Sequence, residues 1–94
     1  MVTGSLSAQV VSVMSLETGD PIEQATVRDL TTGRFNTTDA RGEADITYLG
    51  GSDSIEIRSV GYEVQILSWK ELGKANFLVF LEPTTFALDL RGAA

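Results

Sequence analysis

Apolar and polar residues alternate in short runs along most of this chain, and turn residues separate the runs. In residues 43–48, for example, Ala44, Ile46 and Tyr48 alternate with two acids and a threonine. Because the side chains of a strand point alternately to its two faces, each run predicts a half-buried strand. Helical periodicity is nearly absent. The pattern therefore predicts an all-β protein.

The predicted strands are short and are bounded by turn-forming residues. They cover residues 6–13, 25–30, 35–38, 43–48, 55–58, 62–66, 77–81 and 86–90. The run Phe77–Leu81 is apolar on both faces, which predicts a central strand. No βαβ pattern occurs, so we expect antiparallel pairing. Two sheets packed face to face, or one small closed sheet, would bury the alternating faces.

Turn signals between the runs fix the expected reversals of the chain. Gly19 tolerates a positive φ, and Pro21 lacks the amide that a ladder needs. Residues 39–42, "DARG", place Asp39 first and Gly42 fourth, as a type I turn favours. We expect these residues to serve the architecture.

Residues 55–66, "IEIRSVGYEVQI", change phase in the middle. Apolar residues fall at odd positions in the first part and at even positions from Val60 to Ile66. A shift by one residue turns every later side chain to the other face. Gly61 therefore predicts a bend or bulge at residues 59–61. We expect the apolar residues on both sides of the bend, Tyr62 included, to enter the same core.

One short helical signal lies in residues 68–74, "SWKELGK". Ser68 and Glu71 have the spacing of a capping box, and Gly73 fits a C-terminal stop. We expect at most one short helical turn there.

The composition excludes several classes of function but does not identify one. The 94 residues suit one domain, and 43% hydrophobic residues suffice for one packed core. The net charge is −6 and the seven Lys and Arg are scattered, whereas nucleic-acid binding needs a clustered basic face. No apolar run approaches the roughly 18–20 residues that span a bilayer. We expect neither nucleic-acid binding nor direct membrane insertion.

The chain contains no His and no Cys. Thiol catalysis, Ser–His–Asp catalysis and ordinary zinc sites are therefore excluded. The acids in the turns lack the D-x-D-x-D-G spacing of a calcium loop. An enzyme would need Asp, Glu, Lys or Tyr chemistry, and no such constellation is visible. We expect no catalytic residue, no cofactor and no metal.

Four segments, in order, resemble one family. They are "TGDPIEQATV" (18–27), "TTDARGEADI" (37–46), "IRSVGYE" (57–63) and "VFLEPTTFALD" (79–89). Together they resemble the carboxypeptidase-regulatory-like domain found N-terminal to the plug of TonB-dependent outer-membrane receptors. The chain departs from that pattern at Gln24, where the family has glycine. It also lacks the aromatic residue that the family has two positions after Gly42.

The resemblance implies a fold: a transthyretin-like (prealbumin-like) Greek-key β-sandwich of seven or eight antiparallel strands over residues 1–94. The motif residues that carry the resemblance and its turns are Gly19, Pro21, Asp39, Gly42, Gly61 and Tyr62.

The resemblance also implies a function: a non-catalytic accessory or interaction domain on the periplasmic side of the outer membrane. Its partner would be protein, either the rest of the receptor chain or another periplasmic or outer-membrane protein. Residues 86–90 would offer an edge strand, whose unpaired backbone groups can accept another strand. The candidate contact residues are Trp69, Phe86, Leu88 and Leu90.

A second hypothesis is a surface-exposed or secreted binding or adhesion module, or the accessory domain of a peptidase. It would recognise sugar or protein through loops at one end of the sandwich, including "GGSD" (50–53) and Trp69. Tyr48 and Tyr62 are in phase with apolar neighbours, so we expect them in the core rather than on a sugar-binding platform.

Overall fold

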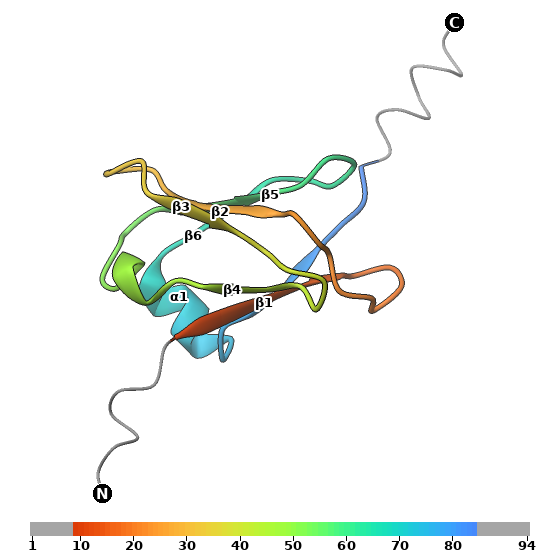
Figure 1. Cartoon of the computed structure of the whole chain (residues 1–94), viewed down its shortest axis with the longest axis horizontal. Coiled ribbons are helices and arrows are strands. Elements are labelled where there is room, and N and C mark those ends of the chain that lie inside the picture. Colours follow the sequence, from red (N-terminus) through yellow and green to blue (C-terminus); the bar gives the residue numbers. More distant parts are fainter. Residues whose placement is uncertain (1–8, 85–94) are drawn as a thin grey trace, which may run out of the picture.

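The computed structural model describes residues 9–84, which form two facing β-sheets. Figure 1 shows the sheets edge-on as two layers. The strands are β1 (Val10–Ser15), β2 (Thr26–Asp29), β3 (Phe35–Thr37), β4 (Glu43–Asp45), β5 (Ile55–Arg58), β6 (Gln65–Leu67) and β7 (Leu78–Leu81). A 3-10 turn, η2 (Thr47–Leu49), and one helix, α1 (Trp69–Lys74), complete the described part.

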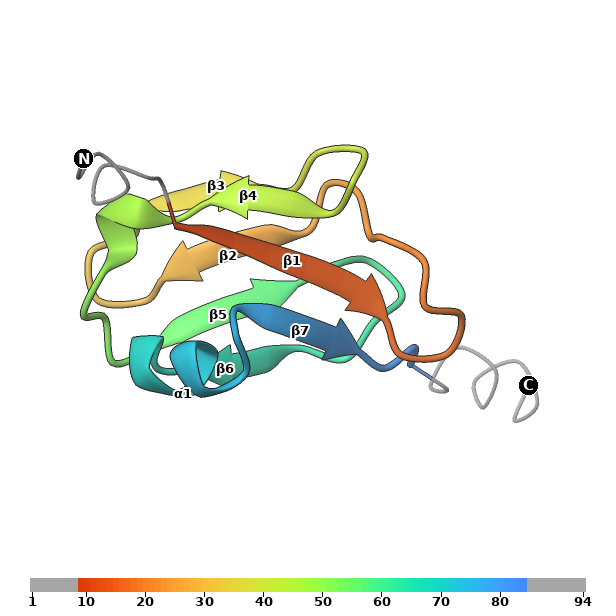
Figure 2. The ribbon, with the colours of Figure 1, turned by 90° about the horizontal axis from the view of Figure 1, so that it is seen from below.

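One sheet has the strand order β4-β1-β7 and the other β3-β2-β5-β6. Figure 2 shows β4, β1 and β7 side by side in the nearer sheet. The predicted two-sheet β-sandwich is therefore confirmed. Its core lies between the sheets, where alternate residues of each strand point inward. The buried apolar residues are Val11, Val13, Ile22, Ala25, Val27, Ala44, Ile46, Leu49, Ile55, Ile57, Leu72, Val79 and Leu81.

One ladder departs from the antiparallel expectation. β1 and β7 run parallel, with Val13 opposite Val79 and Met14 opposite Phe80. A parallel pair needs a long crossover connection. Here the crossover contains all the intervening strands, including the whole second sheet, as well as α1. The parallel pair therefore leaves no local βαβ pattern in the sequence.

The predicted strand over residues 43–48 is wrong in its second half. Strand β4 ends at Asp45, whose Oδ1 accepts hydrogen bonds from the N–H (2.9 Å) and the hydroxyl (2.7 Å) of Thr47. This local bonding favours a turn over a ladder, and η2 begins there. Tyr48 is 45% exposed, and its hydroxyl donates to the Phe35 carbonyl at 2.8 Å. Its expected place in the core is therefore also wrong.

Among the strands of residues 9–84, the predicted central strand at residues 77–81 lies instead at one end of its sheet. β7 pairs with β1 on one side, and Leu78 and Phe80 are 39% and 41% exposed. A run that is apolar on both faces has the same appearance in an edge strand with an apolar outer surface. The strand stops at Leu81, two residues before Pro83, as expected from the proline.

The hairpin of β5 and β6 shows that the side chains after the bend are oriented differently from the prediction. Ile57 faces Gln65 and Ile55 faces Leu67, so both strands turn their odd-numbered residues inward. The even-numbered residues Val64 and Ile66 are exposed, contrary to expectation, and Val60, which lies within the bend, is 99% exposed. Tyr62, by contrast, packs partly buried against the core as predicted.

The bend itself occurs where it was predicted, because Gly61 has a φ of +89°. The N–H of Tyr62 then bonds to the Ser59 carbonyl at 3.1 Å. The loop, rather than a bulge in a continuous strand, therefore accounts for the apparent change of phase.

The capping box of α1 is confirmed. The Glu71 N–H donates to Ser68 Oγ at 3.0 Å, and the Ser68 N–H donates to Glu71 Oε1 at 2.8 Å. Gly73 does not stop the helix, which continues to Lys74 and is capped at Ala75. The chain then reverses through positive φ values at Asn76 and Phe77.

Replacing Gly61 or Gly42 by alanine should lower the stability of the protein by different amounts. At Gly61 a Cβ would meet nothing within 4 Å, so Gly61→Ala carries only the backbone strain of its positive φ, about 1–2 kcal/mol. Gly42 has a φ of +77°, and a Cβ there would lie 2.5 Å from the Val13 carbonyl oxygen. Gly42→Ala should therefore lower the free energy of unfolding further, measured by urea denaturation.

The matched control is Gly50→Ala. Gly50 has an ordinary φ of −55°, and a Cβ added there would lie no closer than 3.4 Å to any neighbouring atom. It should change stability by less than about 0.5 kcal/mol. Equal losses at all three positions would contradict the geometry.

Candidate functional site

The predicted turn residues serve the architecture. Asp39 Oδ1 accepts the N–H groups of Arg41 (2.9 Å) and Glu43 (3.0 Å), and the Gly42 N–H bonds to the Asp39 carbonyl. These amides, with the Arg41 charge nearby, hold the pKa of Asp39 below its ordinary value of 3.8. Gly19 has a φ of +78°, and Pro21 forms an isolated bridge with Met14.

Asp29 and Asp45 repeat this arrangement in other turns. The Thr31 N–H donates to Asp29 Oδ1 at 2.9 Å, and Ser52 Oγ lies 3.0 Å from the same oxygen. Backbone amides, at Thr31 and at Thr47, are the main cause that lowers the pKa of each carboxyl. Within residues 9–84, no cluster of three or more Asp or Glu side chains is arranged so that it could hold a metal ion.

Trp69 contacts the protein's own interior. Its ring meets that of Phe77 edge to face, with centroids 5.1 Å apart and planes at 65°. Both rings are partly buried against the core. The other three candidate contact residues, Phe86, Leu88 and Leu90, lie outside the described residues.

A buried threonine, which the sequence did not single out, ties the two sheets together. Thr38 is only 3% exposed. Its hydroxyl accepts the Ala25 N–H at 2.8 Å and donates to the Ile22 carbonyl at 2.6 Å. Its backbone bonds to the Gln24 N–H and to the Ala25 carbonyl, each at 2.9 Å. Residues 22–25 are therefore held on both their backbone donors and their acceptors.

This clamp holds Gln24 in a conformation that few residues adopt. Gln24 has a φ of +64° without being a glycine. Such a conformation costs of order 1 kcal/mol and persists only where neighbours enforce it. It occurs at the position where the resembling family has glycine, so the departure noted in the sequence coincides with a strained residue.

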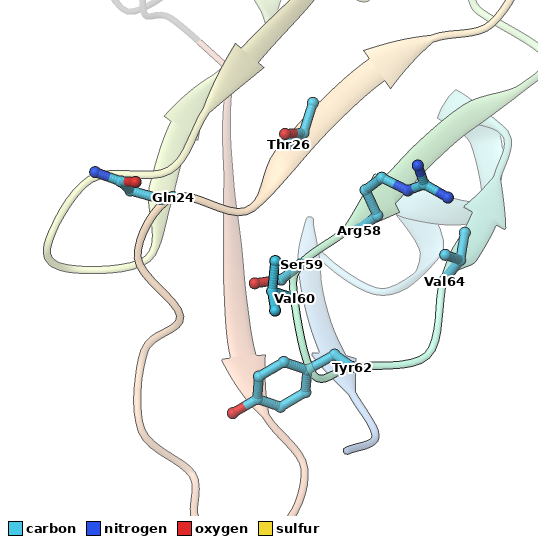
Figure 3. A pocket seen from close by; sticks show the side chains of 7 residues that line it. All are labelled: Gln24, Thr26, Arg58, Ser59, Val60, Tyr62 and Val64. Carbon is cyan, nitrogen blue, oxygen red and sulfur yellow. The ribbon is translucent and has the colours of Figure 1, made fainter. Parts of the chain in front are cut away.

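Gln24 stands at the rim of a pocket of about 330 Å³ (Figure 3). The pocket lies between the start of β2 and the loop that joins β5 to β6. Its lining residues are Gln24, Thr26, Arg58, Ser59, Val60, Tyr62 and Val64. Figure 3 shows Arg58 with Thr26 and Val64 around it, and Ser59 and Val60 at the turn of the loop.

Charge in this pocket is unlike that of the whole chain. The chain carries 13 acids against seven bases, yet the one ionised group among the lining residues is the Arg58 guanidinium. Arg58 Nε lies 3.9 Å from Glu56 Oε1, and 59% of the Arg58 side chain is exposed. The pocket therefore contains one cationic group, which Glu56 borders on one side.

A second surface is apolar and lies on the outer face of the small sheet. Val10 and Met14 of β1 point outward beside Leu78 and Phe80 of β7, with Met14 and Phe80 in direct register. We call these four residues the β1–β7 face. A hollow of about 320 Å³ adjoins its end, lined by Leu16, Glu17, Glu82 and Pro83.

No family model, curated protein or solved structure matches this chain. The family resemblance therefore remains a prediction, and the site is defined by geometry alone. Within residues 9–84, no helix has both the length and the apolar content to cross a membrane.

The lowered pKa values of the turn carboxylates predict a loss of stability in acid. A carboxyl whose pKa is lowered by folding stabilises the protein fully above its unfolded value near 3.8, and this contribution disappears as the pH falls through the lower folded value. The free energy of unfolding should therefore be nearly constant above about pH 5 and should fall below about pH 4. Asp39→Asn should be less stable at pH 7 and should lose less on acidification, as measured by urea denaturation at each pH. A variant whose stability falls with acid as steeply as the parent's would contradict this role for Asp39.

Proposed function

We propose that this chain is a non-catalytic interaction domain that packs against protein through the β1–β7 face. Its most fitting setting is the periplasmic accessory domain of a TonB-dependent outer-membrane receptor. The occupant of the face would then be another part of the same receptor chain.

The observation that supports an interaction role is the β1–β7 face itself. Met14, Leu78 and Phe80 stand on the outside of a three-stranded sheet, and Val10 continues this surface beyond Ser12, which lies opposite Leu78. Single exposed apolar residues are ordinary, whereas a contiguous group on a regular surface is typical of protein contact. Phe80, opposite Met14 at one end of the face, is the type of large aromatic residue that anchors interfaces.

The surroundings of the face suggest the chemistry of its partner. Glu43 and Asp45 lie on the adjacent strand β4, and Glu17 and Glu82 border the hollow at the other end. A surface with an apolar centre and Lys or Arg at its rim would match both features.

The receptor setting is supported by the four ordered segments that resemble the pre-plug domain. The sandwich provides the free-standing scaffold that such a domain would need. The setting can be tested by reading the coding sequence past Ala94. A plug followed by a long series of alternating amphipathic strands is expected, and a stop codon at that point would overturn the receptor setting.

A photo-crosslinking amino acid in place of Phe80, in the complete encoded protein, should trap the partner surface. We expect a crosslink within the same polypeptide, to a peptide beyond Ala94 identified by mass spectrometry. Phe35 is the matched control, because it is a phenylalanine on the outer face of the other sheet and is at least as exposed, at 54% against 41% for Phe80. No crosslink from position 80, or equal yields from positions 80 and 35, would overturn the proposed use of this face.

A further inference from the structure

We propose that the pocket lined by Gln24, Thr26, Arg58, Ser59, Val60, Tyr62 and Val64 binds the carboxylate end of a peptide. The carboxylate would lie against Arg58, and the terminal aliphatic side chain would lie against the two valines. This site is on the four-stranded sheet and its hairpin loop, away from the β1–β7 face. It therefore stands independently of the proposed interaction role.

The polar side chains of this pocket have no hydrogen-bond partner among the described residues. They are the Gln24 amide, the hydroxyls of Thr26, Ser59 and Tyr62, and the terminal nitrogens of Arg58. Some short polar side chains elsewhere are engaged, as in Thr38, Thr47 and Ser52, whereas others stand free at the surface. Several available donors and acceptors around one hollow are what a ligand site requires.

The available charge favours a carboxylate. Arg58 approaches Glu56 only through Nε, at 3.9 Å, so the outer edge of its guanidinium is free of protein acceptors within residues 9–84. A guanidinium donates two parallel hydrogen bonds to a carboxylate, and these charge-assisted bonds are stronger than neutral ones. No acid lines the pocket, and the Glu56 carboxylate borders Arg58 only on its Nε side.

The apolar part of the lining favours a peptide end over an acidic sugar. Val60 is 99% exposed at the turn of the loop, and Val64 is exposed on the outer side of the hairpin. Branched aliphatic side chains suit an aliphatic side chain, whereas sugar rings are recognised mainly on flat aromatic faces. The volume of about 330 Å³ lies at the lower end of the range for small-ligand pockets and suits one or two residues.

The strain at Gln24 adds an independent argument. Glycine would take the same backbone conformation without the cost of a Cβ, and the Thr38 clamp would hold either residue. Strained residues held in place by their surroundings gather at ligand sites. The glutamine brings an amide to the rim that glycine would lack, on the side of the pocket opposite Arg58 (Figure 3).

The test is an NMR titration of the ¹⁵N-labelled chain with acetyl-alanyl-valine and with the same dipeptide as its C-terminal amide. We expect saturable shifts at the amides of residues 58–62 with the free acid, with a dissociation constant in the millimolar range. The amide should bind at least about tenfold more weakly, because it loses the charge-assisted pair with Arg58. Absence of saturable shifts with the acid, or equal binding of the amide, would overturn the proposal.

Three variants and one alternative ligand sharpen this test. Arg58→Gln should weaken binding of the acid about tenfold or more, whereas Arg28→Gln should not, because Arg28 lies on the same sheet face outside the pocket. Gln24→Gly should remain folded and bind several-fold more weakly. Equal affinity of the parent and Arg58→Gln would overturn the site. Equal affinity for glucuronate would overturn the assignment to a peptide.

Discussion

The buried hydroxyl of Thr38 is the constraint on which the rest of this structure depends. It joins the Ala25 amide, at the entrance to β2, to the Ile22 carbonyl. The Ile22 amide bonds in turn to the Val13 carbonyl in the central strand of the other sheet, at 2.9 Å. The Val13 amide then bonds to the Gly42 carbonyl at 2.7 Å. One chain of hydrogen bonds thus crosses from sheet to sheet through the core, where an unpaired group would be costly.

This chain of bonds explains why both surfaces keep their shape. Near β2 it holds Gln24 in its strained conformation at the rim of the pocket. Near β1 it fixes the central strand of the sheet that carries the β1–β7 face. At the edges of the sandwich, side chains of one sheet donate to carbonyls of the other: Asn36 to Asp45 at 3.1 Å and Gln65 to Phe80 at 2.7 Å. Such bonds occupy edge carbonyls that another strand could otherwise use.

Local signals in the sequence were enough for the elements whose bonding is local. The capping box of Ser68 and Glu71 and the turn at Asp39 involve residues three or four apart, so the sequence predicted both. The parallel pairing of β1 with β7 was missed because it depends on a crossover that contains the whole second sheet. The predicted orientation of Val64 and Ile66 was wrong because a hairpin loop, like a bulge, can change which residues of the following strand face the core. The deciding contact is distant in the chain in the first case and lies within one hairpin in the second.

The pocket could not be read from the sequence for the first of these reasons. Thr26 and Arg58 are far apart in the chain and lie side by side only because β2 pairs with β5, which brings Gln24 to the rim of the same pocket. The one available signal was Gln24 itself, a departure from the glycine of the resembling family. The sequence showed only the departure, and the positive φ of Gln24 became visible in the structure.

The central claim is that Thr38 holds an exposed rim in a strained conformation, and amide hydrogen exchange measures this most directly. In the parent chain, the amides of Gln24 and Ala25 should exchange as slowly as that of Val27 in the ladder of β2, although Gln24 is exposed. In Thr38→Val, the Ala25 amide should lose this protection while that of Val27 keeps more of its own. Fast exchange at Gln24 and Ala25 in the parent, or unchanged protection at Ala25 in the variant, would contradict the account.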